Sequence, residues 1–222
     1  MPYNRHSKQE LIQAFYKEPV PFQGADPSTA RCIFIGLDAN FDEHIENSEI
    51  FDDVKSYLRD GPEFWRQNEV HHPFLLENYT GDGRYYHAEF SQIGFTSQHA
   101  DCVSFVEIVP VPTYGRSNLR TADLMSEEIT RHLQALREII LCGRQCVFIS
   151  KSVGNLLRRS PCFSWLPPAP TSDLSGNLMH LKLWNNNIRT HVYCHTHFAR
   201  FGTTGLEAKI GERPEIRHLC NV

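Results

Sequence analysis

The most informative segment for the fold is Arg31-Cys-Ile-Phe-Ile-Gly36-Leu-Asp38-Ala-Asn40-Phe41. Its first half is an unbroken apolar run, which is typical of a strand covered on both faces, as in a parallel sheet. Residues 102–109, 146–150 and 190–194 form three further runs of the same kind. Segments with helical character separate these runs. The alternation predicts an α/β fold with three layers, α/β/α, around a central four-stranded, mainly parallel sheet.

Helices are expected at residues 6–16, 49–67, 122–140 and 151–159, the second being interrupted at Gly61-Pro62. The clearest is 122–140, where apolar residues recur at helical spacing along one stripe. Residues 66–100 differ, because they are rich in His, Tyr, Phe and Gly and lack a sustained period. We expect an elaborated loop region there that shapes a pocket, within a single domain that spans residues 1–222.

The composition is that of an ordinary soluble protein, with 222 residues, 41% of them hydrophobic and 22% charged. The chain contains no membrane-spanning apolar run and does not begin with a secretory signal, so we expect a cytoplasmic monomer that does not bind membranes. A net charge of −4 argues against a broad nucleic-acid surface, although a local basic face can still hold a few phosphates. The seven scattered cysteines are expected to be buried free thiols rather than a disulfide framework or a metal site.

Unusual polar side chains follow three of the predicted strands. Asp38 and Asn40 come after the first, Glu107 lies inside the second, and His195 ends the fourth. Each has a simple structural explanation, since an Asp can cap a helix and a buried acid can be held by backbone donors. Because the carboxyl ends of parallel strands meet at one edge of a sheet, however, an acid, an imidazole and a second acid are expected together there. This combination favours a functional site.

In their order along the chain, these residues resemble the motifs of the uracil-DNA glycosylase superfamily. Gly36 and Asp38 match two positions of the superfamily's first motif, Gly-Gln-Asp-Pro-Tyr-His, and His195 matches the leading His of its second motif. Residues 108–113 and 61–65 are similar to segments that follow the second strand and the first motif in several branches. The resemblance covers about residues 30–205 and rests on the order and spacing of the motifs more than on exact matches.

The resemblance implies that the protein hydrolyses the N-glycosidic bond of a base flipped out of DNA. Asp38 would stabilise the cationic sugar and position a water, while His195 would stabilise the departing base. A side chain after the last strand would fill the gap in the duplex, with Phe198, Arg200 and Phe201 as candidates, and Arg116 and Asn118 would contact DNA. No lysine lies in these two motifs to form a Schiff base with the sugar, so the product would be an abasic site. No cofactor or metal is required.

The residues expected to recognise the base are Asn40, Glu107, Phe41 and Phe64, with Phe51 and Phe74 as further stacking candidates. Where uracil enzymes of the superfamily carry an Asn, this chain carries Glu107, whose carboxylate would accept a hydrogen bond from the amino group of cytosine. Asn40 replaces the Tyr that excludes C5 substituents. In these two positions the chain resembles bacterial anti-phage glycosylases that excise α-glucosylated hydroxymethylcytosine. Alternatively, Glu107 is a second acid that assists water activation, or a protonated buried acid that reads uracil as an Asn would. In either case the alternative is a uracil or deaminated-base repair glycosylase.

Two other classes of function remain open from the sequence. The first is a zinc-dependent hydrolase that uses His71, His72, His195, His197 and Asp38, although these residues lack a characteristic ligand spacing. The second is a DNA-binding module that has the same fold without activity.

Overall fold

The computed structural model describes residues 2–168, 178–181, 189–199 and 202–221. The strands in this part of the chain are β1 (Asn4–Arg5), β2 (Gln23–Gly24), β3 (Cys32–Gly36), β4 (Asn40–Phe41), β5 (Val103–Glu107), β6 (Thr113–Tyr114), β7 (Cys146–Ser150), β8 (Met179–Leu181) and β9 (His191–His195). The α-helices are α1 (Gln9–Phe15), α2 (Phe51–Arg59), α3 (Gly61–Asn68), α4 (Arg84–Ser91), α5 (Glu127–Cys142), α6 (Lys151–Leu157) and α7 (Thr203–Cys220). Short 3₁₀ helices occur at Ile45–Asn47, Pro73–Leu75, Ser97–Cys102, Asp123–Met125 and Pro161–Phe163.

The main sheet has six strands in the order β2-β5-β3-β7-β9-β8. The four inner strands are parallel and correspond to the four apolar runs of the sequence, whereas β2 and β8 pair antiparallel at the two edges. The expected four-stranded sheet is therefore two strands too small. The two edge strands are only two and three residues long, which is too short for a periodic pattern to reveal them.

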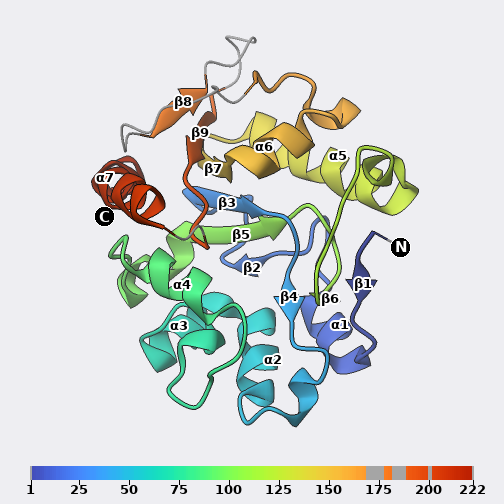
Figure 1. Ribbon diagram of the computed structural model, residues 1–222, viewed down its shortest axis with the longest axis vertical. Helices are drawn as coiled ribbons and strands as arrows, with labels where there is room; N and C mark the ends of the chain where they lie inside the picture. Colours follow the sequence, from blue (N-terminus) through green and yellow to red (C-terminus); the bar gives the residue numbers. More distant parts are fainter. Residues whose placement is uncertain (1, 169–177, 182–188, 200–201, 222) are drawn as a thin grey trace.

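Helices lie on both sides of this sheet, with α5 and α6 on one side and α1 to α4 on the other (Figure 1). Strand β3 shows why the sheet needs cover on both faces. Ile33 and Ile35 pack in the cluster that includes the apolar stripe of α5, while Phe34 belongs to a second cluster and stacks on Phe148 at 4.8 Å between ring centroids. Successive side chains of a strand point to opposite faces, so one apolar run serves both layers.

The expected helices are present, with α2 and α3 divided at Gly61 as the Gly-Pro pair predicts. Two helices were not expected. Helix α4 lies within residues 66–100, so that region is only partly loop. Helix α7 contains Gly205, Gly211 and Pro214, which lower helix propensity and hide it from pattern reading. Burial of one side of α7 against the rest of the protein, including Ile216, compensates for this.

Cys32 and Cys220 form a disulfide that joins the start of β3 to the last turn of α7. The expectation that all the cysteines are free thiols is therefore wrong for this pair. The other five are free thiols as expected, but only Cys162 and Cys194 are buried, whereas Cys142 is exposed. No helix within the described residues is long and apolar enough to cross a membrane.

Candidate active site

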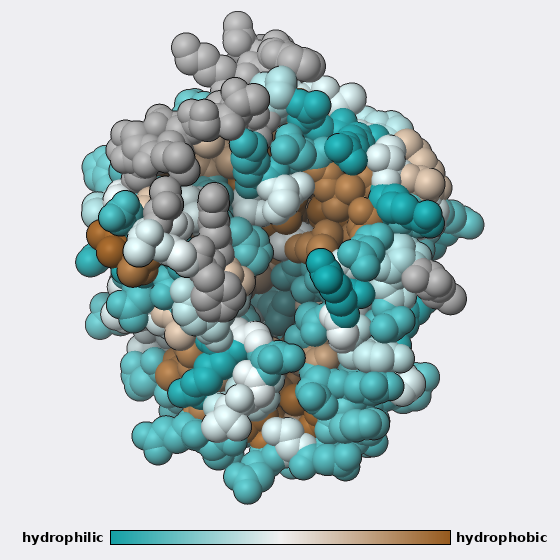
Figure 2. Space-filling view, in the orientation of Figure 1, coloured by the Kyte–Doolittle hydropathy of each residue, from teal (hydrophilic) through white to brown (hydrophobic). Residues whose placement is uncertain are grey.

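A cavity of about 250 Å³ opens at the carboxyl ends of β3 and β5. The space-filling view shows the molecule hollowed near the middle of this face, between β4 and α4 (Figures 1 and 2). Its walls come from the β3–β4 connection, the end of β5, the 72–87 region and the segment after β9. The lining residues are Gln23, Gly36, Leu37, Asp38, Ala39, Asn40, Phe41, His72, Phe74, Gly83, Tyr86, His87, Phe105, Glu107, His197 and Ala199.

Asp38 is held in this cavity by hydroxyl groups from another part of the chain. The residues around it form a small sheet in which β6 lies between β1 and β4. This pairing brings Thr113 and Ser117 to the carboxylate, and their hydroxyls donate to Asp38 Oδ2 at 2.5 and 2.6 Å. All the hydrogen bonds made by the half-buried carboxylate in the described part of the chain use Oδ2. Oδ1 is thereby left for a ligand or a water.

Asn40 shares the same sheet and lies at the exposed rim of the cavity. Its amide nitrogen donates to the Gly115 carbonyl at 2.5 Å and lies 3.4 Å from Asp38 Oδ2. Since both of these contacts use the amino group, the amide oxygen of Asn40 remains as an acceptor at the rim.

Glu107 ends β5 directly beside Gly36, its register partner in β3. A Cβ atom at position 36 would lie 2.0 Å from Glu107 Oε2, so the carboxyl group occupies the space that a side chain at Gly36 would need. Burial raises the pKa of Glu107 to about 8, and the Asp38 carboxylate contributes in the same direction. At neutral pH this shift favours a neutral acid with one donor and one acceptor, which is the protonated form considered for uracil rather than the acceptor-only carboxylate considered for cytosine.

The cavity-lining histidine after β9 is His197 rather than His195. His195 is 6% exposed and its ring packs 4.7 Å from Phe198, with Nδ1 bonded to the Thr196 carbonyl at 2.8 Å. His197 lies at the exposed rim, where its Nδ1 accepts from the Ala199 amide at 3.2 Å. This bond places the ring hydrogen on Nε2. Partial burial and the nearby Lys209 cation lower the pKa of His197, which favours a neutral imidazole that donates from Nε2.

A wall of imidazoles closes the opposite side of the cavity. The His72 and His87 rings stack at 3.6 Å, and His71 Nε2 lies 3.1 Å from His87 Nδ1. Burial lowers the pKa of His71 to about 3 and holds those of His72 and His87 well below their usual range. The wall is therefore polar but uncharged at neutral pH.

The remaining predicted site residues are divided between the cavity, the core and the surface. Phe41 and Phe74 line the cavity, and their rings meet edge to face at 5.8 Å. Phe64 belongs to the same core cluster as these two rings, but it is 2% exposed, packs against Tyr57 and does not line the cavity, so it is not placed to contact a base. Phe51 packs in that cluster as well.

The residues expected to contact or wedge into DNA are also divided. Phe198 is 3% exposed and lies among core aromatic rings, a position unsuited to a wedge, which has to be accessible. Arg200 and Phe201 fall outside the described residues. Arg116 and Asn118 are exposed, as a DNA contact requires.

A neighbouring hollow of about 360 Å³ shares Leu37 and His197 with the cavity. Polar side chains form much of its lining, which comprises Leu37, Ser117, Asn118, Leu119, Ser152, Val153, Asn155, Leu156, Arg159 and His197. Hydroxyl, amide and guanidinium groups of this kind suit the phosphate backbone of a nucleic acid.

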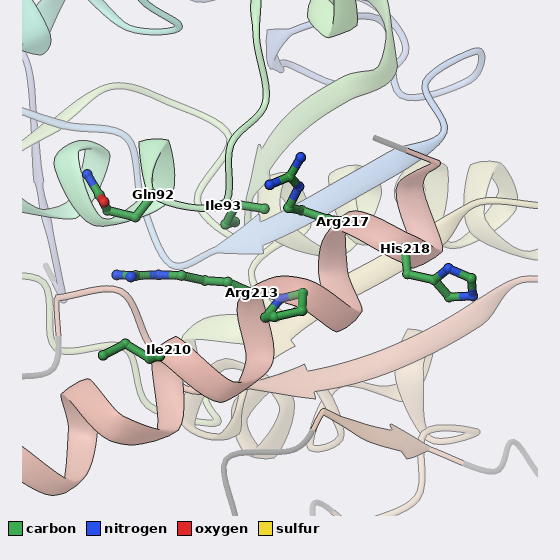
Figure 3. Close-up of a pocket in the computed structure, with 7 residues that line it drawn as sticks. Gln92, Ile93, Ile210, Arg213, Arg217 and His218 are labelled. Atoms are coloured by element: carbon green, nitrogen blue, oxygen red, sulfur yellow. The ribbon is translucent and has the colours of Figure 1, made fainter.

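A third hollow, of about 520 Å³, lies beside α7 and is lined by Gln92, Ile93, Ile210, Arg213, Pro214, Arg217 and His218 (Figure 3). It is larger, but it has no carboxylate and it contains none of the predicted site residues. The smaller cavity around Asp38 is therefore the better candidate for chemistry. Within the described residues, no three His, Cys, Asp or Glu side chains are grouped to hold a metal ion.

Comparisons with models of protein families, with curated proteins and with solved structures find no match to this chain.

Proposed function

We propose that this protein is a monofunctional DNA glycosylase with a fold like that of uracil-DNA glycosylases, acting on a modified pyrimidine. One observation carries the proposal: Asp38, held by two hydroxyl groups, shares a cavity with Glu107 and His197. The motif order that resembles the superfamily supports the same reaction. A base removed from the stack can reach such a recessed carboxylate, whereas a base within duplex DNA cannot.

Each of the three groups has a role in hydrolysis. As the N-glycosidic bond breaks, its electron pair leaves with the base and the sugar becomes cationic, which the Asp38 carboxylate stabilises from nearby. His197 donates its Nε2 hydrogen to the carbonyl oxygen of the departing base. A water then adds to the anomeric carbon and transfers a proton to Asp38 or onward to solvent. This scheme assigns to His197 the role that the sequence suggested for His195.

The product is an abasic site. The cavity has no lysine among its described lining residues, so no amine is placed to form a Schiff base with the sugar and cleave the strand. The neighbouring polar hollow, with Ser117 and Arg159, is suited to the phosphates beside the flipped nucleotide. Arg116 and Asn118 would add further contacts to DNA.

The favoured substrate is a cytosine with a polar group on C5, such as α-glucosylated hydroxymethylcytosine in phage DNA. A neutral Glu107 can accept a hydrogen bond from the amino group of cytosine and donate one to N3. The small Asn40 leaves room beside C5 and offers its amide oxygen to a hydroxyl group. An activity of this kind would serve defence against phages.

Uracil is the second candidate, and the neutral state of Glu107 supports it. With the two oxygens exchanged, the same carboxyl group accepts from uracil N3 and donates to O4. The two candidates differ above pH 8, where Glu107 becomes acceptor-only. Recognition of uracil O4 is then lost, whereas the bond from the cytosine amino group is kept.

The decisive experiment incubates the protein with DNA containing uracil, hydroxymethylcytosine or its α-glucosylated form. Abasic sites are scored by alkaline strand cleavage, with the Asp38→Asn variant as the control for contaminating activity. We expect release from the glucosylated DNA by the unmodified protein only. Release from uracil DNA alone would support the repair alternative. Binding of DNA without any release would support a non-catalytic DNA-binding module.

A further inference from the structure

Helix α7 holds the segment that carries His197 through a buried acid. Glu212 accepts the Thr196 amide hydrogen, with the nitrogen 3.0 Å from Oε1 and 2.9 Å from Oε2. The Thr196 hydroxyl donates to Oε1 at 2.8 Å. These three contacts are all the hydrogen bonds that the carboxylate makes within the described residues. All of these hydrogen bonds therefore go to Thr196, the residue between His195 and His197.

A cation one turn earlier on α7 holds the same segment at a second point. Lys209 donates to the Phe198 carbonyl at 3.1 Å and forms an ion pair with Glu89 of α4 at 2.8 Å. Arg213 pairs with the same Glu89 at 3.1 Å, and Figure 3 shows its side chain leaving α7 beside Ile210. Helix α7 is thus bonded both to the His197 segment and to α4, which provides Tyr86 and His87 to the cavity.

We propose that Glu212 is a positioning residue that fixes the Thr196 peptide and thereby holds the His197 imidazole at the rim of the cavity. Burial of a carboxylate costs free energy unless hydrogen bonds compensate for the lost water, and here the bonds to Thr196 do so. Hydrogen bonds to a charged acceptor are short and directional, which restricts the backbone next to His197 more tightly than apolar packing does. The catalytic consequence rests on the proposed function, but the positioning itself does not.

The sharpest test is Glu212→Gln, because glutamine keeps the size of the side chain and removes one acceptor oxygen. Its amino group would face the two donors of Thr196, so at least one of the present contacts becomes impossible. The matched control is Glu207→Gln, which makes the same change of charge at an exposed position on α7. Thr196→Val is a milder second variant that removes the hydroxyl bond and keeps the backbone bond, which covers the possibility that Glu212→Gln does not fold.

Two measurements on each variant separate the positioning from the reaction. The first follows amide hydrogen exchange at Thr196 and Ala199 and the imidazole nitrogen resonances of His197 by NMR. We expect exchange at Thr196 to accelerate on the order of 10- to 100-fold in Glu212→Gln, the scale of a lost charge-assisted hydrogen bond. The His197 resonances should shift as its bond to Ala199 loosens. Thr196→Val should show the same changes to a smaller extent, and Glu207→Gln should show neither.

The second measurement is single-turnover base release together with affinity for DNA. We expect Glu212→Gln to slow release while it binds DNA as well as the Glu207→Gln control does. If Glu212→Gln and Thr196→Val leave both the exchange rates and the His197 resonances unchanged, the positioning role is wrong, whatever the activity. If the resonances change but the unmodified protein releases no base, the proposed function fails and the positioning of His197 stands.

Discussion

The two sides of the cavity around Asp38 differ in kind. The strand side carries two acids, Asp38 and Glu107, whereas the side built from residues 72–87 carries two stacked imidazoles, His72 and His87. Burial acts on both and in opposite senses, since it raises the pKa of Glu107 and lowers those of the histidines. In each case the uncharged form is favoured. This cavity therefore concentrates its negative charge on Asp38 and surrounds it with neutral polar groups.

Such an arrangement suits a reaction in which positive charge develops on the substrate. A single anion among neutral groups interacts strongly with a nearby cation, because few other charges compete with it or screen it. A second ionised acid or a charged imidazole would change that balance. The strand side therefore supplies the charge, and the imidazole side supplies shape and hydrogen bonds.

Removing the charge should have the largest effect. We expect Asp38→Asn to reduce single-turnover base release on the order of 10²- to 10⁴-fold, the usual range for a group that acts on a proton or water in the transition state. The fold should persist, because the asparagine oxygen can still accept from Thr113 and Ser117. DNA affinity, measured by fluorescence anisotropy, should be equal or higher. The exposed Asp82→Asn is the control, and equal activity in the two variants would remove Asp38 from the reaction.

The second largest effect is expected on stability, at the close contact between Gly36 of β3 and Glu107 of β5. Gly36→Ala places a Cβ 2.0 Å from Glu107 Oε2, so the carboxyl group has to move. Forced overpacking of this kind costs about 1–3 kcal/mol of unfolding free energy. Because the conflict is with one side chain, Glu107→Ala combined with Gly36→Ala should recover most of that loss. Urea unfolding of the two single variants and the double variant measures the coupling, and simple additivity would show that the contact is not the cause.

A smaller effect is the dependence of stability on pH. The folded pKa of Glu107 is about 8 and its ordinary value is 4.5, so between these values the folded protein retains a proton that the unfolded chain releases. Stability contributed by this group is therefore lost as pH rises through that window. Glu107→Gln cannot titrate, so its unfolding free energy relative to the unmodified protein should increase from pH 4.5 to pH 8. The control is the exposed Glu77→Gln variant, whose unfolding free energy relative to the unmodified protein should change less with pH. An equal change in the two variants would mean that Glu107 is ionised in the folded state.

The strand side of the cavity could be predicted from the sequence, and the imidazole side could not. Apolar runs place four parallel strands, and parallel strands bring their carboxyl ends together, so Asp38 and Glu107 meet as expected. The short β2 and β8 have no periodic signal. His72 and His87 meet only because helix α4 packs against residues 72–75, a contact between segments that share no sequence pattern.

The choice between His195 and His197 shows a second limit. Residues two apart face the same way along a strand, so alternation does not distinguish them. The distinction depends on where β9 ends and on the bonds of Thr196 to Glu212 in α7. That helix is concealed in the sequence by its glycines and proline. Phe198 and Ala199, which follow His197, give no turn signal either, since neither is a turn-forming residue type.

The smallest expected effect is the absence of titration near neutral pH among the buried histidines on the imidazole side of the cavity. His71, His72 and His87 should show no change in their ring resonances across the neutral pH range, since burial keeps their pKa values far below it. In the urea-unfolded protein the same rings should titrate near pH 6.5, as free imidazoles do at about that value. Two-dimensional NMR of the histidine side chains measures both states. A folded-state transition near neutral pH in His72 or His87 would mean that this side of the cavity carries charge, and the contrast with the strand side would then disappear.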